Sequence, residues 1–160
     1  MKLITELNEE VQYITEKSED GKKHSYIIGR FMTTEEKNKN GRLYKKEAIE
    51  NEVDRYIREV VKAKRALGEL NHPQGPTINL DRVSHIITEL SKDGNHYIGK
   101  AKLTETPMGK IAIGLLNSGG QLGVSTRGMG SLIEKNGVKY VQGDFKLSTV
   151  DIVADPSGPG

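Results

Sequence analysis

Apolar and polar positions alternate along several short stretches of this chain, and the pattern predicts more strands than helices. Residues 25–32 (SYIIGRFM) are apolar and rich in residues that favour strands. Period-two alternation recurs in 79–90 and 96–103, and the turn-forming sequence KDGN between them predicts a hairpin. Further strands are expected within residues 122–134, 138–142 and 145–153.

Two segments have the spacing of helices instead. From Lys45 to Lys64 apolar residues recur every three or four positions, which predicts one face of an amphipathic helix. Residues 106–117 begin with threonine and proline, which suit a helix cap and first turn. Together these elements favour a β-rich α+β fold, a mostly antiparallel, barrel-like core with the two helices packed outside.

The chain has 160 residues, which fits one domain. Residues 1–20 are rich in Glu, Asn and Lys, and they are expected to add one edge strand or to stay loose. We therefore expect an N-terminal segment over residues 1–20 and the folded domain over residues 21–160.

Charge and composition exclude several classes of protein. The 24 Lys and Arg nearly balance the 22 Asp and Glu, so nucleic acid is not the first expectation. The basic run Arg55–Arg65 could bind phosphates, but its apolar spacing favours an ordinary solvated helix face. Without cysteine there is no disulfide, thiolate zinc site or cysteine nucleophile. No apolar run approaches the roughly 20 residues that span a bilayer, so a soluble, cytosolic protein is expected.

One histidine has an unusual setting, in the stretch GELNHPQGP. His72 follows an apolar, strand-like piece, and Pro73 restricts its backbone to an extended or turn conformation. A histidine held at the end of a strand is well placed to act as a base, although turn histidines without chemistry are common. The other histidines, His24, His85 and His96, are interpreted as surface or packed strand residues.

Ser125 and Asp151 are two further candidates for chemistry. Ser125 lies in GGQLGVSTRGMG, where small neighbours would let a substrate backbone approach, although a plain glycine-rich turn or bulge is the alternative. Asp151 lies among β-branched residues, where an acid must face solvent or be paired. The chain has no HExxH motif or phosphate-binding glycine loop, so neither a metal nor a cofactor is expected.

Four segments carry a family resemblance: GRLYKKEAI (41–49), ALGELNHP (66–73), GVSTRGMGSL (123–132) and FKLSTVDIVADPSGP (145–159). The chain resembles, from about Tyr26 to Pro159, the prohead maturation serine proteases of T-even-like tailed bacteriophages, which are related to the herpesvirus capsid maturation proteases (assemblin). The resemblance implies a serine endopeptidase inside the phage prohead, in the bacterial host cytoplasm. Its expected substrates are scaffold or core proteins and major capsid proteins, with no cofactor, nucleic acid or membrane.

The resemblance also implies roles for individual residues. Ser125 matches the nucleophile and His72 the base, while Asp151 falls where the third triad member is expected. Related capsid proteases vary between histidine and an acid at that third position. Candidates for binding the oxyanion or substrate are Arg127 and the residues after the last strand, Ser157, Gly158 and Gly160.

The family is expected to cleave after glutamate in an apolar-x-Glu pattern. Such triplets end at Glu6, Glu9 and Glu16, so self-trimming of residues 1–20 is expected. The cation that would select glutamate stays open among Arg82, Arg127 and the lysines. A non-catalytic scaffold or interaction module of the same fold is the main alternative, and the oligomeric state is left open.

Overall fold

The protein is described by a computed structural model over residues 1–8 and 11–154, within which the chain forms eleven strands and two α-helices. The strands are β1 (Lys2–Asn8), β2 (Val11–Lys17), β3 (Lys23–Thr33), β4 (Arg42–Tyr44), β5 (Leu67–Glu69), β6 (Val83–Asp93), β7 (His96–Leu103), β8 (Gly123–Gly130), β9 (Leu132–Lys135), β10 (Val138–Val141) and β11 (Lys146–Val153). The helices are α1 (Lys46–Tyr56), continued by a π-helical turn η1 (Ile57–Val61), and α2 (Pro107–Asn117), and a short 3₁₀ turn η2 covers Leu80–Arg82.

The described strands form three sheets. The site sheet has the order β1-β8-β11, the large sheet β2-β3-β7-β6-β5, and the small sheet β4-β10-β9. The pairs within them are antiparallel except for β10 with β4. The predicted β-rich, mostly antiparallel α+β fold is therefore confirmed.

The expected closure into a barrel is not observed. Closure requires an unbroken ladder of hydrogen-bonded strands, whereas the large sheet ends at β5 and the site sheet at β11. Between these two edges the described chain makes one isolated parallel bridge, Leu70 with Ile152. The core is instead a set of open sheets packed on one another.

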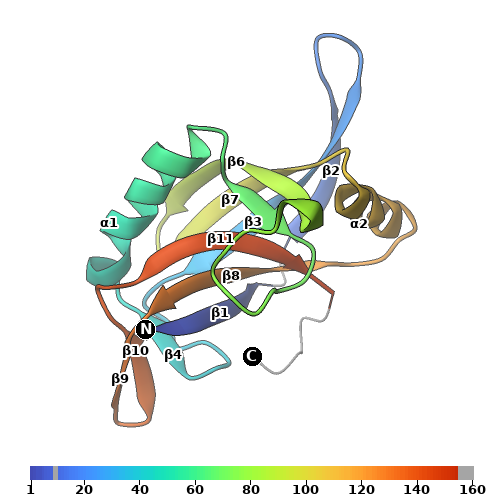
Figure 1. Cartoon of the computed structure of the whole chain (residues 1–160). Helices are drawn as coiled ribbons and strands as arrows, with labels where there is room; N and C mark the ends of the chain where they lie inside the picture. Colours follow the sequence, from blue (N-terminus) through green and yellow to red (C-terminus); the bar gives the residue numbers. More distant parts are fainter. Residues whose placement is uncertain (9–10, 155–160) are drawn as a thin grey trace.

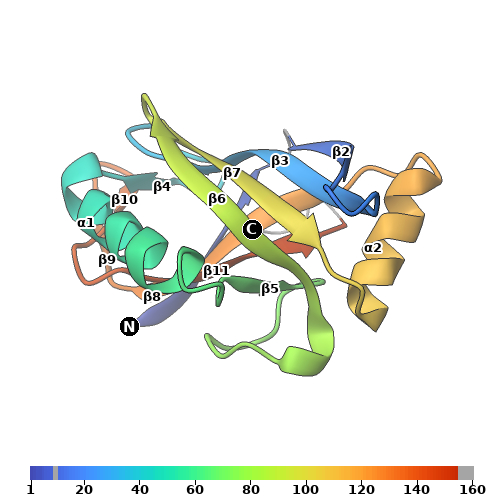
Figure 2. The ribbon, with the colours of Figure 1, turned by 90° about the horizontal axis from the view of Figure 1, so that it is seen from above.

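The two helices lie at opposite ends of this arrangement (Figures 1 and 2). Helix α1 buries Ile49, Val53 and Tyr56 in the apolar core, which confirms the predicted apolar face. The helix predicted to reach Lys64 ends in the π-helical turn η1 rather than in regular α-helix. In α2, Thr106 caps the helix by accepting a hydrogen bond from the Gly109 N–H, as its sequence suggests.

The predicted hairpin is formed by β6 and β7, with Asp93 opposite His96 and Gly94 at a φ of 62° in the turn. Strand β6 begins at Val83 rather than at residue 79, because residues 80–82 form the turn η2. The hairpin is the most extensive local pairing that the alternating pattern predicted.

Residues 1–17 contribute two strands where the sequence suggested a single edge strand or a loose segment. Strand β1 pairs with β8, and β2 pairs with β3. Ile4 lies in the apolar core, which gives β1 a packing role that the polar composition of the segment conceals.

Candidate active site

Strand β5 and the turn after it bring the segment carrying His72 to the edge of the site sheet. Gly68 packs so closely that a Cβ there would lie 2.1 Å from His85 Nε2, so glycine is required. Asn71, in left-handed backbone conformation at a φ of 67°, donates its N–H to the carbonyl of Ile152 at 2.7 Å. Asparagine tolerates this conformation better than most residues. The chain therefore turns onto β11 just before His72.

His72 and Asp151 are joined by a hydrogen bond. His72 Nδ1 lies 3.0 Å from Asp151 Oδ2, and the aspartate side chain is fully buried while the histidine side chain is 28% exposed. With Asp151 ionised, Nδ1 carries the proton and Nε2 is left with its lone pair. The imidazole is thus oriented by a buried acid and remains accessible from solvent.

Ser125 lies directly across the sheet from Asp151. It is on β8, it is 3% exposed, and its register partner on β11 is Asp151. Opposite residues of an antiparallel pair project from the same face, with Cβ atoms about 5 Å apart. The structure therefore brings Ser125, Asp151 and His72 together. Within the described residues no hydrogen bond joins Ser125 to His72, and such contacts often tighten only when substrate binds.

Arg127 is buried beside this group, with a fully covered side chain. Its Nε donates to Asp151 Oδ2 at 2.8 Å, and Nη2 donates to Asp151 Oδ1 at 3.0 Å and Glu69 Oε2 at 3.1 Å. Its Nη1 donates to the carbonyls of Gly75 at 2.8 Å and Thr77 at 3.1 Å. These bonds use all five N–H groups of a guanidinium. The side chain has no donor left for an oxyanion or a substrate glutamate, which corrects that interpretation of Arg127.

A second buried acid, Glu69, completes the cluster. Its backbone N–H donates to Asp151 Oδ1 at 3.0 Å, and its carboxylate accepts from the Asn79 N–H at 3.0 Å as well as from Arg127. Arg82 Nε lies 3.7 Å from its other oxygen. The sequence reasoning missed Glu69, although the signal was present: like Asp151, it is an acid inside an apolar strand-like piece.

Burial and hydrogen bonding act in opposite directions on the Asp151 carboxyl. Burial alone would raise its pKa, but the hydrogen bond from His72 and the hydrogen bonds and charge of Arg127 outweigh burial, and its pKa is lowered. The carboxylate is therefore ionised at neutral pH and can accept a hydrogen bond from the Nδ1–H of His72.

His85 is a packed strand residue, as its alternating pattern predicted. Its ring is buried between Ser84 Oγ, 2.8 Å from Nδ1, and the Val150 carbonyl, 2.6 Å from Nε2. Burial lowers its pKa. The His85 ring thus bonds the backbone of β11 and packs against Gly68 of β5.

The remaining candidates are not brought to the site by the described part of the chain. Ser157, Gly158 and Gly160 lie outside the described residues. Among residues 1–8 and 11–154 no group of three or more His, Asp or Glu side chains is arranged to hold a metal ion. None of the helices within those same ranges is long and apolar enough to cross a membrane.

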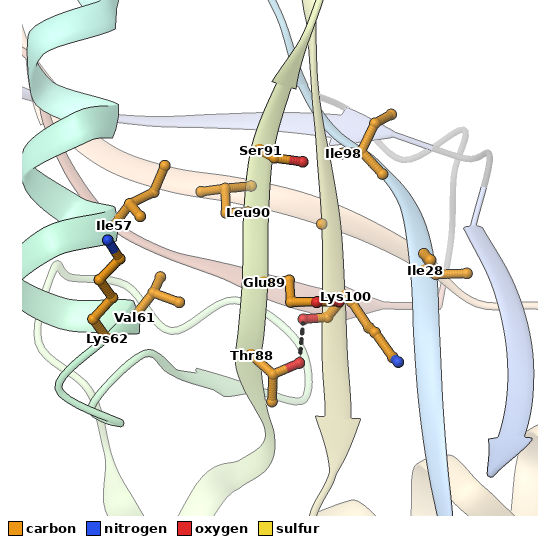
Figure 3. Close-up of a pocket in the computed structure, with 11 residues that line it drawn as sticks. Ile28, Ile57, Val61, Lys62, Thr88, Glu89, Leu90, Ser91, Ile98 and Lys100 are labelled. Atoms are coloured by element: carbon orange, nitrogen blue, oxygen red, sulfur yellow. Dashed lines mark hydrogen bonds between the residues drawn. The ribbon is translucent and has the colours of Figure 1, made fainter.

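A pocket of about 380 Å³ lies elsewhere, beside η1 on the large sheet (Figure 3). Its walls come from η1, β3, β6 and β7, and its lining includes none of the predicted triad or oxyanion residues. Its lining includes Ile28, Ile57, Val61, Leu90, Ile98 and Lys100.

Comparisons with known proteins identify the family of the chain. Residues 5–160 match the family described as prohead core protein serine protease. The prohead core protein protease of Enterobacteria phage T4 is 42% identical over 139 residues, covering 84% of this chain and 65% of that protein. The chain thus spans less than two thirds of that relative's length.

The fold is also shared with a solved structure, that of the bacteriophage T4 capsid assembly protease, gp21. The two agree with a TM-score of 0.91 at 34% sequence identity, over 97% of this chain and 98% of the other. The family resemblance read from the four sequence segments is confirmed. The chain belongs to the prohead core protein serine protease family.

Proposed function

We propose that this chain is a serine endopeptidase of a phage prohead, in the cytoplasm of the bacterial host. It cleaves scaffold or core proteins and major capsid proteins after glutamate, in an apolar-x-Glu pattern, during head maturation. The observation that carries the proposal is the His72–Asp151 hydrogen bond at 3.0 Å, formed where Asp151 is the register partner of Ser125.

In the proposed reaction, Ser125 Oγ attacks the scissile carbonyl carbon and His72 Nε2 takes its proton. Asp151 holds the imidazole with its other proton on Nδ1 and stabilises the imidazolium. His72 then returns the proton to the leaving amine as the C–N bond breaks, which leaves an acyl group on Ser125. Water, activated by the same base, hydrolyses that ester and restores the serine.

The developing oxyanion needs hydrogen-bond donors. By family resemblance these are backbone N–H groups of Ser157, Gly158 and Gly160, in the segment that follows β11. The buried guanidinium of Arg127 is not among the proposed donors, because its N–H groups are engaged by Asp151, Glu69 and two backbone carbonyls.

The decisive experiment is digestion of an unstructured peptide containing Ile-Thr-Glu-Leu. We expect cleavage after glutamate by the chain as given, and a loss of at least about 10³-fold in Ser125→Ala and in His72→Ala. Cleavage products are identified by mass spectrometry. Ser131→Ala is the matched control, since Ser131 bonds Asp144, away from the site.

Absence of cleavage by the folded wild-type chain, with Ser125 also unlabelled by a fluorophosphonate, would contradict the proposal. That result would favour the alternative of a non-catalytic scaffold or interaction module with the same fold. Cleavage that persists in Ser125→Ala would retain an endopeptidase but remove the assigned nucleophile.

A further inference from the structure

The five hydrogen bonds of Arg127 connect three separate parts of the chain. Two go to Asp151 on β11, one goes to Glu69 on β5, and two go to the carbonyls of Gly75 and Thr77. Gly75 and Thr77 belong to the segment 70–79, hereafter the His72 loop, which follows β5. In Figure 1 this green loop passes in front of β11 and β8.

The His72 loop has few other attachments to the body of the protein. At its start, the Leu70 N–H bonds the Arg82 carbonyl, the Asn71 N–H bonds the Ile152 carbonyl and Arg82 Nη2 bonds the Leu70 carbonyl at 2.5 Å. At its end, Asn79 bonds Glu69, and the Asn79 carbonyl accepts from the Arg82 N–H at 2.9 Å. Between these points, in the described structure, the hydrogen bonds to the rest of the protein are those of His72 to Asp151 and of the Arg127 guanidinium to the two carbonyls.

We propose that Arg127, held in place by Glu69, is a positioning residue that fixes both Asp151 and the His72 loop, and so sets the placement of the His72 imidazole relative to Ser125. The inference rests on the proposed function, because it concerns the efficiency of that proton transfer. Arg127 does not touch substrate. It acts through His72 and Asp151.

The shape of the guanidinium is what allows one side chain to do this. Its planar fork directs N–H groups to three sides, whereas a lysine ammonium has three donors on a single atom. A lysine would keep a positive charge between Asp151 and Glu69 but could not also reach both loop carbonyls. Arg127→Lys therefore keeps the positive charge beside Asp151 and Glu69 and removes the hydrogen bonds that position the His72 loop.

The test compares steady-state kinetics of the full chain and of Arg127→Lys with the Ile-Thr-Glu-Leu peptide. We expect kcat to fall about 10²-fold, the scale of loss caused by an ångström of misplacement in a catalytic group, with little change in KM. Arg58→Lys is the matched control, because Arg58 is an exposed arginine on η1. Circular dichroism checks that each variant is folded.

Two further measurements distinguish positioning from a general structural role. Activity of Arg127→Ala is expected to recover in part when guanidinium is added at concentrations that do not denature the wild type. Amide hydrogen exchange in residues 70–79 is expected to rise in Arg127→Lys while the β6–β7 hairpin keeps its protection. A uniform loss of protection would instead indicate a purely structural role and overturn the inference.

Glu69→Gln provides a second variant if Arg127→Lys does not fold. It keeps the size of the side chain and one oxygen acceptor but removes the charge that holds Nη2 of Arg127. The expected result is again a lower kcat at nearly constant KM.

Wild-type kcat in a folded Arg127→Lys, or in a folded Glu69→Gln when the lysine variant does not fold, overturns this inference and leaves the proposed function standing. A wild-type chain that neither cleaves the peptide nor reacts with a fluorophosphonate at Ser125 overturns the proposed function and this inference with it.

Discussion

Asp151 shows what a single residue in a sequence does and does not reveal. Its β-branched neighbours indicated that it must be exposed or paired, but strand alternation left both faces open. The side is decided by register, because Asp151 faces Ser125 across β8 and β11. Register depends on the bulge between Leu147 and Thr149, which no local pattern in the sequence marked.

The same limit applies to Arg127 and Glu69. The sequence shows a cation two residues after Ser125, and alternation places both on one face of a strand. It does not show that a glutamate 58 positions earlier meets that cation in the interior. The sequence therefore leaves Arg127 as one candidate among several for contacting substrate, whereas the three-dimensional contacts show that its N–H groups are used internally.

At this scale the Asp151 pKa leads to a prediction about acid stability. Because hydrogen bonds and the charge of Arg127 lower the pKa of Asp151 in the folded chain below its ordinary 3.8, ionised Asp151 stabilises the fold. That stabilisation is complete above the ordinary pKa and is lost as pH falls through the lower, folded value. Urea unfolding from pH 5 down to pH 2.5 should therefore show a steeper loss for wild type than for Asp151→Asn.

Asp151 is hydrogen-bonded by His72, Arg127 and the backbone of Glu69, and it interacts electrostatically with Tyr56 and His85. Asp54→Asn provides the matched control, since Asp54 is an exposed acid on α1. Equal pH dependence in wild type and Asp151→Asn would contradict the prediction. At neutral pH, Asp151→Asn should also lower kcat by about 10³-fold or more.

At the level of elements, long periodic segments were predicted best. The β6–β7 hairpin and helices α1 and α2 follow from alternation, helical spacing and capping residues. The three-residue strand β4 was not predicted, because it has too few positions for a period to show, whereas β5 lies in the strand-like piece expected before His72. Strand β5 matters most here, since it carries Glu69 and leads into the His72 loop.

Gly68 tests how tightly β5 is held. A Cβ at this position would lie 2.1 Å from His85 Nε2 and 2.5 Å from the Val150 carbonyl oxygen, so the backbone of β5 must shift in Gly68→Ala. We expect a loss of about 1–3 kcal/mol in the free energy of unfolding, measured by urea denaturation, together with reduced peptide cleavage.

Gly143→Ala is the control for that substitution, because a Cβ there meets no atom within 4 Å. Its stability should stay within about 0.5 kcal/mol of wild type. Comparable losses in the two variants would show that the close packing of Gly68 on His85 does not govern the position of β5.

For the whole molecule, the overall class of fold was predictable, whereas the relation between sheets was not. Alternation indicates which residues face a core, but not which sheets share that core or whether their edges join. The open edges at β5 and β11, and the burial of Ile4 in β1, arise from contacts between distant segments.

The arrangement of the first two strands refines the expected self-trimming. Glu6 is buried in β1 with its side chain bonded to Arg42, whereas Glu16 is exposed near the tip of the β2–β3 hairpin, which projects from the body in Figure 1. A protease needs an accessible, extended backbone. We therefore expect a cut after Glu16 before any cut after Glu6, while Glu9 lies outside the described residues.

Intact mass after prolonged incubation measures this directly. The wild-type chain should lose residues 1–16, whereas Ser125→Ala and Glu16→Gln should keep them. A first cut after Glu6, or no loss of mass from a chain that cleaves the test peptide, would contradict the expectation.

Because the proposed site is divided between two sheets, its parts are synthesised at different times. His72 comes from the edge of the large sheet, while Asp151 lies on β11, the last described strand of the chain. A ribosome must therefore add a further 79 residues after His72 before the base can meet its acid partner. Proteolysis of the proposed kind would therefore begin only after β11 has been made and has paired with β8.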